Sequence, residues 1–235
     1  MKLKALIICL SFVMIFSPLS LQAKDLADAT TITVQGASQT DVVPDIAYIQ
    51  LAVVTSAATV VQAQEENARL SSQVMKRLEV AGIENDYIKT VQFSVFPLYQ
   101  QEDSKQTGLP ILRGYQVTNG FTVTVTPDRA GEIIDLALQA GVNTIQNIRF
   151  GKNDEVTSKN AVLQAAVRDA LTKADAIAAV MGKQVSRIQS VNESGVYIQN
   201  PEIGRYNLKM GDASTSISPG LIHLNANVQV VVEFE

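Results

Sequence analysis

The chain has 235 residues, of which 46% are hydrophobic and 18% charged, a composition typical of a folded protein with a substantial core. Its 19 Lys and Arg residues against 23 Asp and Glu give a net charge of −4. Without a basic run, nucleic acid and anionic lipid are poor candidate partners. One Cys, one His and no Trp exclude most thiol, soft-metal and histidine-dependent chemistry.

The first residues have the pattern of a secretory signal. Lys2 and Lys4 form a positive start, residues 5–16 form an apolar stretch, and Leu21-Gln22-Ala23 is a small-residue cleavage site. We therefore predict a signal peptide over residues 1–23 that is cleaved on export. The apolar stretch is short for an uncleaved membrane anchor, and no later segment is long and apolar enough to span a bilayer.

Cleavage at this site would leave one domain over residues 24–235. Cys9, the only cysteine, lies in the signal, so the mature chain would have no thiol. Loss of Lys2 and Lys4 with the signal would make the net charge about −6. A thiol-free chain suits an oxidising compartment, since it cannot form wrong disulfides there.

The first half of the domain shows strand, helix and strand signals in turn. Thr59 with Gln62 has the pattern of a capping box, and Gly82 has that of a C-terminal glycine, which predicts a helix between them. Polar residues predict a turn at Ala37–Asp41 and an exposed loop at Gln101–Gly108. Alternating polar and apolar residues predict strands at 31–35, 47–53, 91–97 and 115–125.

The second half contains two further helices. Thr126-Pro127-Asp128 predicts an N-cap and a helix that ends at Gly141. The longest helix is expected over Asp154–Met181, with Asp169 and Lys173 as an exposed pair one turn apart. Its apolar stripe is Leu163, Ala166, Val167, Ala170, Leu171, Ala174, Ile177, Ala178 and Met181. Strands are expected at 142–150, 186–198 and 221–234.

This order predicts an α+β fold. We expect a mostly antiparallel sheet with three helices packed on one face. It would contain two strand–helix–strand units and a C-terminal pair of long strands. The loop Asn200–Gly220 between those strands is long for a compact domain, and a subunit-contacting arm and simple flexibility are equally open readings of it.

The residues with catalytic potential do not form a site in the sequence. His223 is expected on the polar face of the last strand, and as a lone histidine without cysteine it is an unlikely metal ligand. Asp41 and Asp45 resemble paired carboxylates, but aspartates in such a turn more often bond to the backbone. We therefore assign no catalytic, cofactor-binding or metal-binding residue, and expect no cofactor.

From about residue 30 to residue 235 the chain resembles the SIMPL-domain family, a bacterial domain of unknown function. The motifs are Gly36, Pro44-Asp45-Ile46-Ala47, Ala81-Gly82-Ile83, Pro97-Leu98-Tyr99, Gly114-Tyr115-Gln116-Val117, Gly141-Val142, Ile148-Arg149-Phe150, the Ala-rich run 165–170, Gly182 and Pro219-Gly220. The resemblance implies an exported periplasmic or outer-membrane-associated protein, often homo-oligomeric, with members linked to oxidative-stress tolerance. It brings no catalytic residues.

We expect a non-enzymatic, periplasmic protein of the cell envelope that self-assembles into a homo-oligomer through exposed strand edges. A contribution to oxidative or envelope stress tolerance and a peripheral association with the outer membrane both follow from the resemblance alone. The alternative is a binding module for a small ligand or envelope partner, with Tyr48, Tyr99 or Tyr115 in a groove on the sheet. The identity of such a ligand is not indicated by the sequence.

Overall fold

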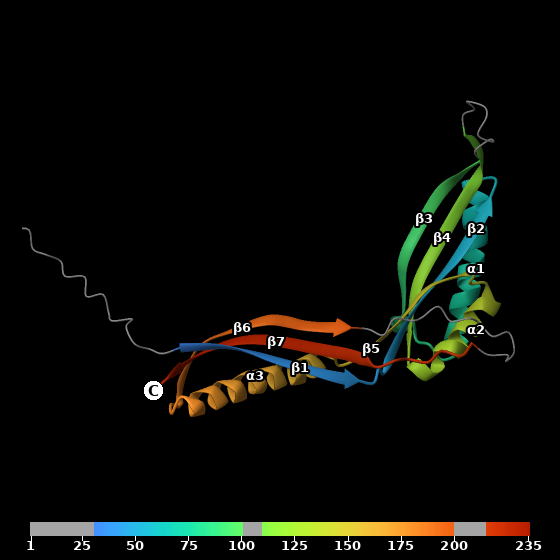
Figure 1. Cartoon of the computed structure of the whole chain (residues 1–235). Coiled ribbons are helices and arrows are strands. Elements are labelled where there is room, and N and C mark those ends of the chain that lie inside the picture. Colours follow the sequence, from blue (N-terminus) through green and yellow to red (C-terminus); the bar gives the residue numbers. More distant parts are fainter. Residues whose placement is uncertain (1–30, 101–109, 200–214) are drawn as a thin grey trace, which may run out of the picture.

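The computed structural model describes residues 31–100, 110–199 and 215–235 (Figure 1). The expected signal peptide 1–23, the loop Gln101–Gly108 and most of the loop Asn200–Gly220 lie outside the described residues. The α+β class and the three helices are confirmed. The strands are β1 Thr31–Val42, β2 Ile46–Ala57, β3 Ile88–Gln100, β4 Ile111–Val125, β5 Thr144–Gly151, β6 Val185–Gln199 and β7 Ile222–Phe234. The helices are α1 Val60–Val80, α2 Ala130–Ala140 and α3 Glu155–Val180, with short 3-10 turns at Asn85–Tyr87 and Pro127–Arg129.

The described strands form two antiparallel sheets where one was expected. One sheet has the order β1-β7-β6 and the other the order β3-β4-β2-β5. β2 is paired with β4 on one side and with β5 on the other, so both of its edges are occupied. β1 therefore does not pair with β2, its neighbour in the chain, and pairs with β7. The two sheets extend in different directions, which gives the molecule the L shape of Figure 1.

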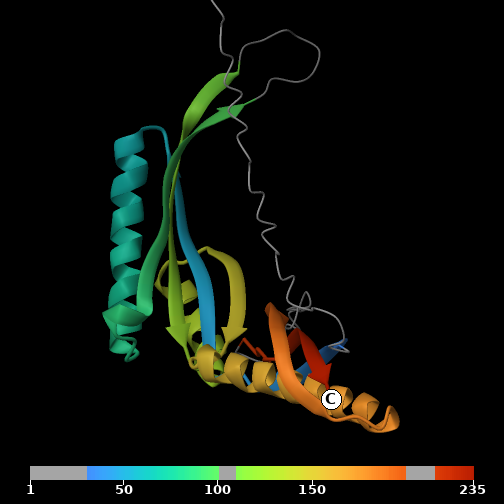
Figure 2. The same ribbon diagram turned by 90° about the vertical axis from the view of Figure 1, so that its left-hand side faces the viewer.

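The four-stranded sheet contains both expected strand–helix–strand units. The unit β2-α1-β3 encloses β4 in the sheet order, and the unit β4-α2-β5 encloses β2. Such interlocked units form the split β-α-β arrangement of ferredoxin-like folds. Both helices cover the same face of the sheet, and none of the described helices lies over the other face (Figure 2).

The core of this sheet lies between its strands and α1 and α2. Ala47, Ile49, Leu51 and Val53 are fully buried on the face predicted from their alternation. Asn67 is also buried, and its side-chain amide donates to the carbonyl oxygens of Val53 at 2.8 Å and Val117 at 3.2 Å. This polar side chain therefore joins α1 to two strands at once.

The helix-end signals are largely confirmed. The Thr59 hydroxyl accepts a hydrogen bond from Gln62 N at 3.3 Å, and Gly82 follows α1 with φ +81°. Gly141 ends α2 with φ +125°. Thr126 is an N-cap with Pro127 directly after it, as expected, but it caps the 3-10 turn Pro127–Arg129 that precedes α2, through its backbone oxygen and not its side chain.

The three-stranded sheet packs on α3 through small side chains. The buried face of α3 consists of residues four apart, namely Val162, Ala166, Ala170, Ala174 and Ala178. The sequence-predicted stripe was too broad, since Ile177 and Met181 are exposed. On β7 the expected inward face, with Val228, Val230 and Val232, is buried.

The expected turn at Ala37–Asp41 is wrong, because these residues continue β1 and pair with β7. Gly36 belongs to the same strand and lies against α3. A β-carbon at Gly36 would come within 2.1 Å of the Ala166 carbonyl oxygen. Gly36 is therefore needed for the close approach between the strand and the helix.

Candidate functional site: edge strands and joint

Each described sheet has two edge strands, and edge strands carry unpaired backbone groups that can pair with another chain. The edges are β1 and β6 in the three-stranded sheet and β3 and β5 in the four-stranded sheet. They differ in how far their free backbone is protected. That difference locates the candidate functional surface.

The β1 edge is closed by two charged side chains of α3. Lys173 Nζ donates to the Gln35 carbonyl oxygen at 3.0 Å, and Ala37 N donates to Asp169 Oδ2 at 2.9 Å. Lys173 and Asp169 also form an ion pair with an N–O distance of 2.6 Å. The pair that the sequence predicted on a free helix surface instead occupies backbone groups of the edge strand.

The Asp169 carboxyl shows the electrostatic consequence of this closure. Its pKa lies below the ordinary value of 3.8, first because the Lys173 ammonium donates to it and second because Ala37 N–H does. The carboxylate therefore stays ionised at neutral pH. A charged pair of this kind blunts an edge that is otherwise free to accept another strand.

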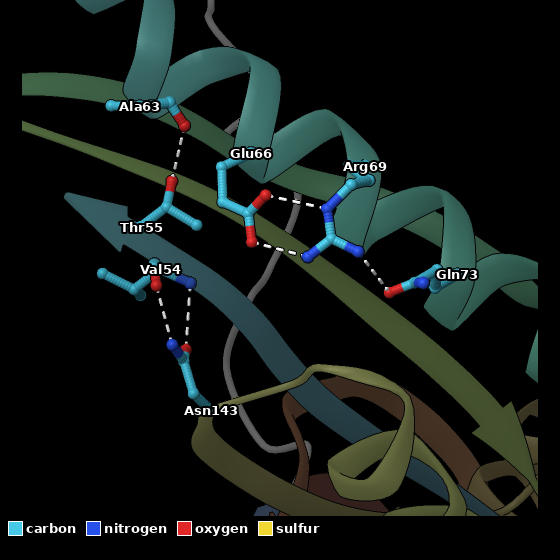
Figure 3. A network of polar contacts seen from close by, with 7 residues as sticks. All are labelled: Val54, Thr55, Ala63, Glu66, Arg69, Gln73 and Asn143. Carbon is cyan, nitrogen blue, oxygen red and sulfur yellow. Dashed lines mark hydrogen bonds and ion pairs between the residues drawn. The ribbon is translucent and has the colours of Figure 1, made fainter. Parts of the chain in front are cut away.

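β5 is a short edge strand, and the side chain of the residue before it extends its pairing with β2. Asn143 precedes β5, and its amide binds Val54 twice, accepting from the nitrogen at 2.9 Å and donating to the oxygen at 2.7 Å (Figure 3). Thus Asn143 mimics one more residue of strand pairing. On the opposite side of β2, the Thr55 hydroxyl donates to the Ala63 oxygen of α1 at 2.7 Å, which ties β2 to the helix (Figure 3).

The β3 edge is long, apolar and uncovered. Phe93 is 59% exposed and Val95 38%, although both lie on the helix-side face of the sheet, opposite Asn119 and Val117 of β4. They remain exposed because α1 packs mainly on β2 and β4 and does not cover β3. We call the exposed apolar residues of this strand the β3 edge surface: Val91, Phe93, Val95, Phe96 and Tyr99.

Three other features of β3 bear on strand pairing. Lys89 is its one charged residue, so the strand lacks the charges that usually protect an edge. Pro97 has no N–H to offer a further strand, which confines regular pairing to the residues before it. The register of β3 against β4 also shifts between Thr90 and Gln92, so the backbone of β3 is open to regular pairing with a further strand over Gln92–Phe96.

The β6 edge is open but irregular. Its register against β7 shifts three times, between Val185 and Arg187, Ile188 and Ser190, and Glu193 and Val196. Such bulges bend a strand and interrupt its pairing. β3 has two such shifts, which leave Gln92–Phe96 regular between them, so β6 is the poorer template for another strand, although Ile188 and Val191 are exposed on it.

The joint between the two sheets is organised by Asp45. Asp45 N donates to the Gly151 oxygen at 3.1 Å, and its carboxylate accepts from Asn153 N at 2.7 Å and pairs with Lys152 Nζ at 2.7 Å. The hydrogen bond from Lys152 is the main cause that lowers the pKa of Asp45 below 3.8, and Asn153 N–H adds to it. Asp45 therefore fixes the segment Gly151–Asn153 at the end of β5 to the start of β2.

A second connection between the sheets is the segment that begins at Thr215 and leads into β7. Thr215 N donates to Asp135 Oδ2 of α2 at 3.0 Å, and its hydroxyl donates to Asp135 Oδ1. A β-carbon at Gly131 would meet the Thr215 oxygen at 2.0 Å, and Ile217 packs on the core of the four-stranded sheet. The end of the expected loop therefore binds its own chain.

A pocket of about 410 Å³ lies beside the joint, a volume within the range of small-molecule sites. Its charged groups already have partners. Asp45 is held by Lys152, while Arg129 donates to the Ala81 oxygen at 2.8 Å and pairs with Glu132 at 3.4 Å. The two charged side chains that line this pocket therefore serve structural contacts.

The residues considered for chemistry are separated by the fold. His223 Nδ1 lies 2.6 Å from Asp41 Oδ1 on neighbouring strands, a contact that the sequence did not indicate, while Asp45 is bound to Lys152. Asp41 and Asp45 therefore do not form a carboxylate pair. In the described parts of the chain, no three His, Cys, Asp or Glu side chains are grouped as a metal site would require.

The expected tyrosine groove is not formed by the described residues. Tyr48 lies on the uncovered face of the four-stranded sheet, with the Arg149 guanidinium 4.3 Å from its ring centre. Tyr115 pairs with Ala57 on the other face, and Tyr99 is near the far end of β3. The tyrosines do not converge, which argues against that groove.

Comparison with known proteins gives a consistent relationship across the chain. Residues 32–232 match the SIMPL family model, described as "Protein of unknown function (DUF541)". The chain is 28% identical over 192 residues to the uncharacterized protein YggE of Escherichia coli K12, covering 81% of this chain and 76% of the relative. It is 26% identical over 215 residues to the 26 kDa periplasmic immunogenic protein of Brucella melitensis, covering 87% and 84%. None of the helices described for this chain is both long and apolar enough to cross a membrane.

Proposed function

The chain belongs to the SIMPL family, and we propose that it is a non-catalytic cell-envelope protein that works as a homo-oligomer assembled through the β3 edge surface. The observation that carries this proposal is the exposure of Phe93 and Val95 on a long, nearly uncharged edge strand. An edge of this kind is a site for strand addition, and natural proteins protect it or use it. A second copy of the chain would cover it.

A periplasmic address supports the same picture. The Brucella relative is named a periplasmic protein, and residues 1–23 of this chain have the pattern of a cleaved export signal. In that compartment the mature chain would be free of cysteine, since Cys9 lies in the signal. Peripheral contact with the outer membrane remains part of the proposal through the family resemblance.

We place any contribution to oxidative or envelope stress tolerance in the assembly and not in redox chemistry. A mature chain without cysteine has no thiol to oxidise reversibly. The charged groups around the pocket at the joint are taken up in structural pairs. A protective role would therefore depend on what the oligomer covers or holds.

The test is the native mass of the exported protein, measured by light scattering after size-exclusion chromatography. We expect an oligomer for the wild type and a shift to monomer for Phe93→Lys combined with Val95→Lys, because both lysines would be buried unpaired in the interface. Val180→Lys is the matched control, since Val180 is 91% exposed at the end of α3. A monomeric wild type at high concentration, or an unchanged mass in the double variant, contradicts the proposal.

A further inference from the structure

The face of the β1-β7-β6 sheet opposite α3 carries an unusual set of side chains. The printed register places them in rows across the strands: Gln39 with Asn225 and Tyr197, Ala37 with Asn227, Gln35 with Gln229 and Asn192, and Thr33 with Val231 and Ser190. Six of these residues end in a primary amide, namely Gln35, Gln39, Asn192, Asn225, Asn227 and Gln229. We call this surface the amide face.

The amides of this face have unused hydrogen-bonding capacity. Each offers two N–H donors and a carbonyl acceptor, and none of the six makes a side-chain hydrogen bond to any described residue. This contrasts with Asn67 and Asn143, whose amides each bind two backbone groups. Structural asparagines in this chain are thus recognisable by their partners, and the amide face lacks such partners.

Among the strand residues of the amide face, charge is confined to the two ends, while Lys173 and Asp169 of α3 reach the backbone of Gln35 and Ala37 at the β1 edge. Arg187 and Glu233 form an ion pair of 2.7 Å at one end, and His223 lies 2.6 Å from Asp41 at the other. The four rows between contain amides, hydroxyls, one tyrosine and small or apolar side chains, but no acidic or basic residue. Protein surfaces ordinarily mix many charges among their polar groups. Four successive rows without a charged residue therefore favour an uncharged, polar ligand over a charged one.

The aromatic residue of the face adds an apolar contact. Tyr197 is 62% exposed and stands in the row of Gln39 and Asn225. A tyrosine ring offers a flat apolar surface beside polar groups, which suits the C–H face of a sugar ring. Four rows at two residues each along a strand extend over about 20 Å, which is room for a short oligosaccharide.

We propose that the amide face binds the glycan strand of the cell wall along β7, through its backbone of N-acetylated amino sugars, which is uncharged where the lactyl carboxyls are amide-linked to peptide. The complementarity is in charge and hydrogen bonding: a neutral face of donors and acceptors meets a neutral ligand whose hydroxyl and acetamido groups are donors and acceptors. Nucleic acids and anionic polysaccharides require cations that these rows lack. The Brucella relative is named a periplasmic protein, and the cell-wall glycan lies in that compartment.

The experiment measures binding of the exported protein to the hexamer of N-acetylglucosamine by calorimetry and to purified cell-wall sacculi by co-sedimentation. The variants are Asn227→Asp with Gln229→Glu, which keep side-chain size but charge the face, and Tyr197→Ala. Gln64→Glu with Gln139→Glu, on exposed positions of α1 and α2, is the matched control. Cellohexaose, which lacks the acetamido groups, tests whether those groups of the ligand contribute to binding.

We expect wild type and control to bind both probes, both face variants to lose about tenfold in affinity or more, and cellohexaose to bind more weakly than the acetylated hexamer. Absence of wild-type binding, equal binding by the charged variant, or equal affinity for cellohexaose overturns the proposal. A change of native mass in the charged variant without a change in glycan binding also overturns it, because the face would then be a contact between copies. Repeating the assay with Phe93→Lys and Val95→Lys separates this result from the assembly at β3.

Discussion

β1 and β3 are both long edge strands of an antiparallel sheet that has a helix on one face. They differ in how their free backbone groups are protected. At β1 the helix α3 lies close enough for Lys173 and Asp169 to bind backbone groups of the strand. At β3 the helix α1 stops over β4, and Phe93 is left exposed. One edge is closed from within the chain, and we propose that a second molecule covers the other.

The difference follows from how closely a helix approaches its sheet. Gly36 and the alanines of α3 bring helix and strand together, so that side chains of ordinary length reach the edge. Over the four-stranded sheet, α1 and α2 share one face and are positioned by the split strand order, which leaves β3 uncovered by them. Closure of an edge is therefore a property of packing and not of the strand sequence alone.

Gly36→Ala should break the comparison at β1 with the largest effect. The added methyl would meet the Ala166 oxygen at 2.1 Å and Ala170 N at 2.7 Å, both backbone atoms that cannot move alone. We expect a loss of about 3 kcal/mol in the free energy of unfolding, measured by urea denaturation.

Gly120→Ala is the control for that change. A β-carbon there would lie 3.2 Å from the Gln92 β-carbon, a contact that a small shift relieves. We expect it to cost under about 1 kcal/mol. Equal losses for the two variants would contradict the close packing of β1 on α3.

Asp169→Ala should reopen part of the β1 edge with a smaller effect. Ala37 N–H would lose its acceptor, and Lys173 would lose its partner in the ion pair. We expect hydrogen exchange at the Ala37 amide to quicken by about two- to fivefold, as suits an exposed pair. Glu66→Ala removes the Arg69 pair on α1 and should leave that amide unchanged, so an equal response in both variants would contradict the closure.

Acid should weaken the same closure over a defined range. Asp169 has a pKa below 3.8 in the folded chain, first because Lys173 donates to it, so its contribution is complete above the unfolded value and is lost as pH falls through the folded one. We expect the carboxyl of Asp169 to titrate below 3.8 by NMR and the Ala37 amide shift to follow it. A midpoint at or above 3.8 would show that the contact does not form in solution.

Local signals in the sequence predicted local structure well. Thr59, Gly82 and Gly141 marked helix ends because capping depends on a few neighbouring residues. The alternation in β7 predicted its buried face because one side of that strand is covered along its whole length.

Long-range relations were not predictable in the same way. β1 pairs with a strand from the other end of the chain. This pairing brings Asp41 into contact with His223 and makes residues Ala37–Asp41 part of a strand, where a turn was expected. The pair of Asp169 and Lys173 has the ordinary spacing of a surface pair, and only its distance from β1 reveals its role. The exposure of β3 likewise depends on where α1 ends over the sheet, which alternation along the strand does not encode.

The most direct test of the account compares hydrogen exchange in β1 and β3 for wild type and the variant with Phe93→Lys and Val95→Lys. We predict that the outward amides of Gln92–Phe96, which do not bond to β4, are protected in the wild type and exchange rapidly in the variant, while the amide of Ala37 keeps its protection in both. If the β3 amides exchange at the same rate in wild type and variant, no second molecule covers this edge, and the central claim is wrong.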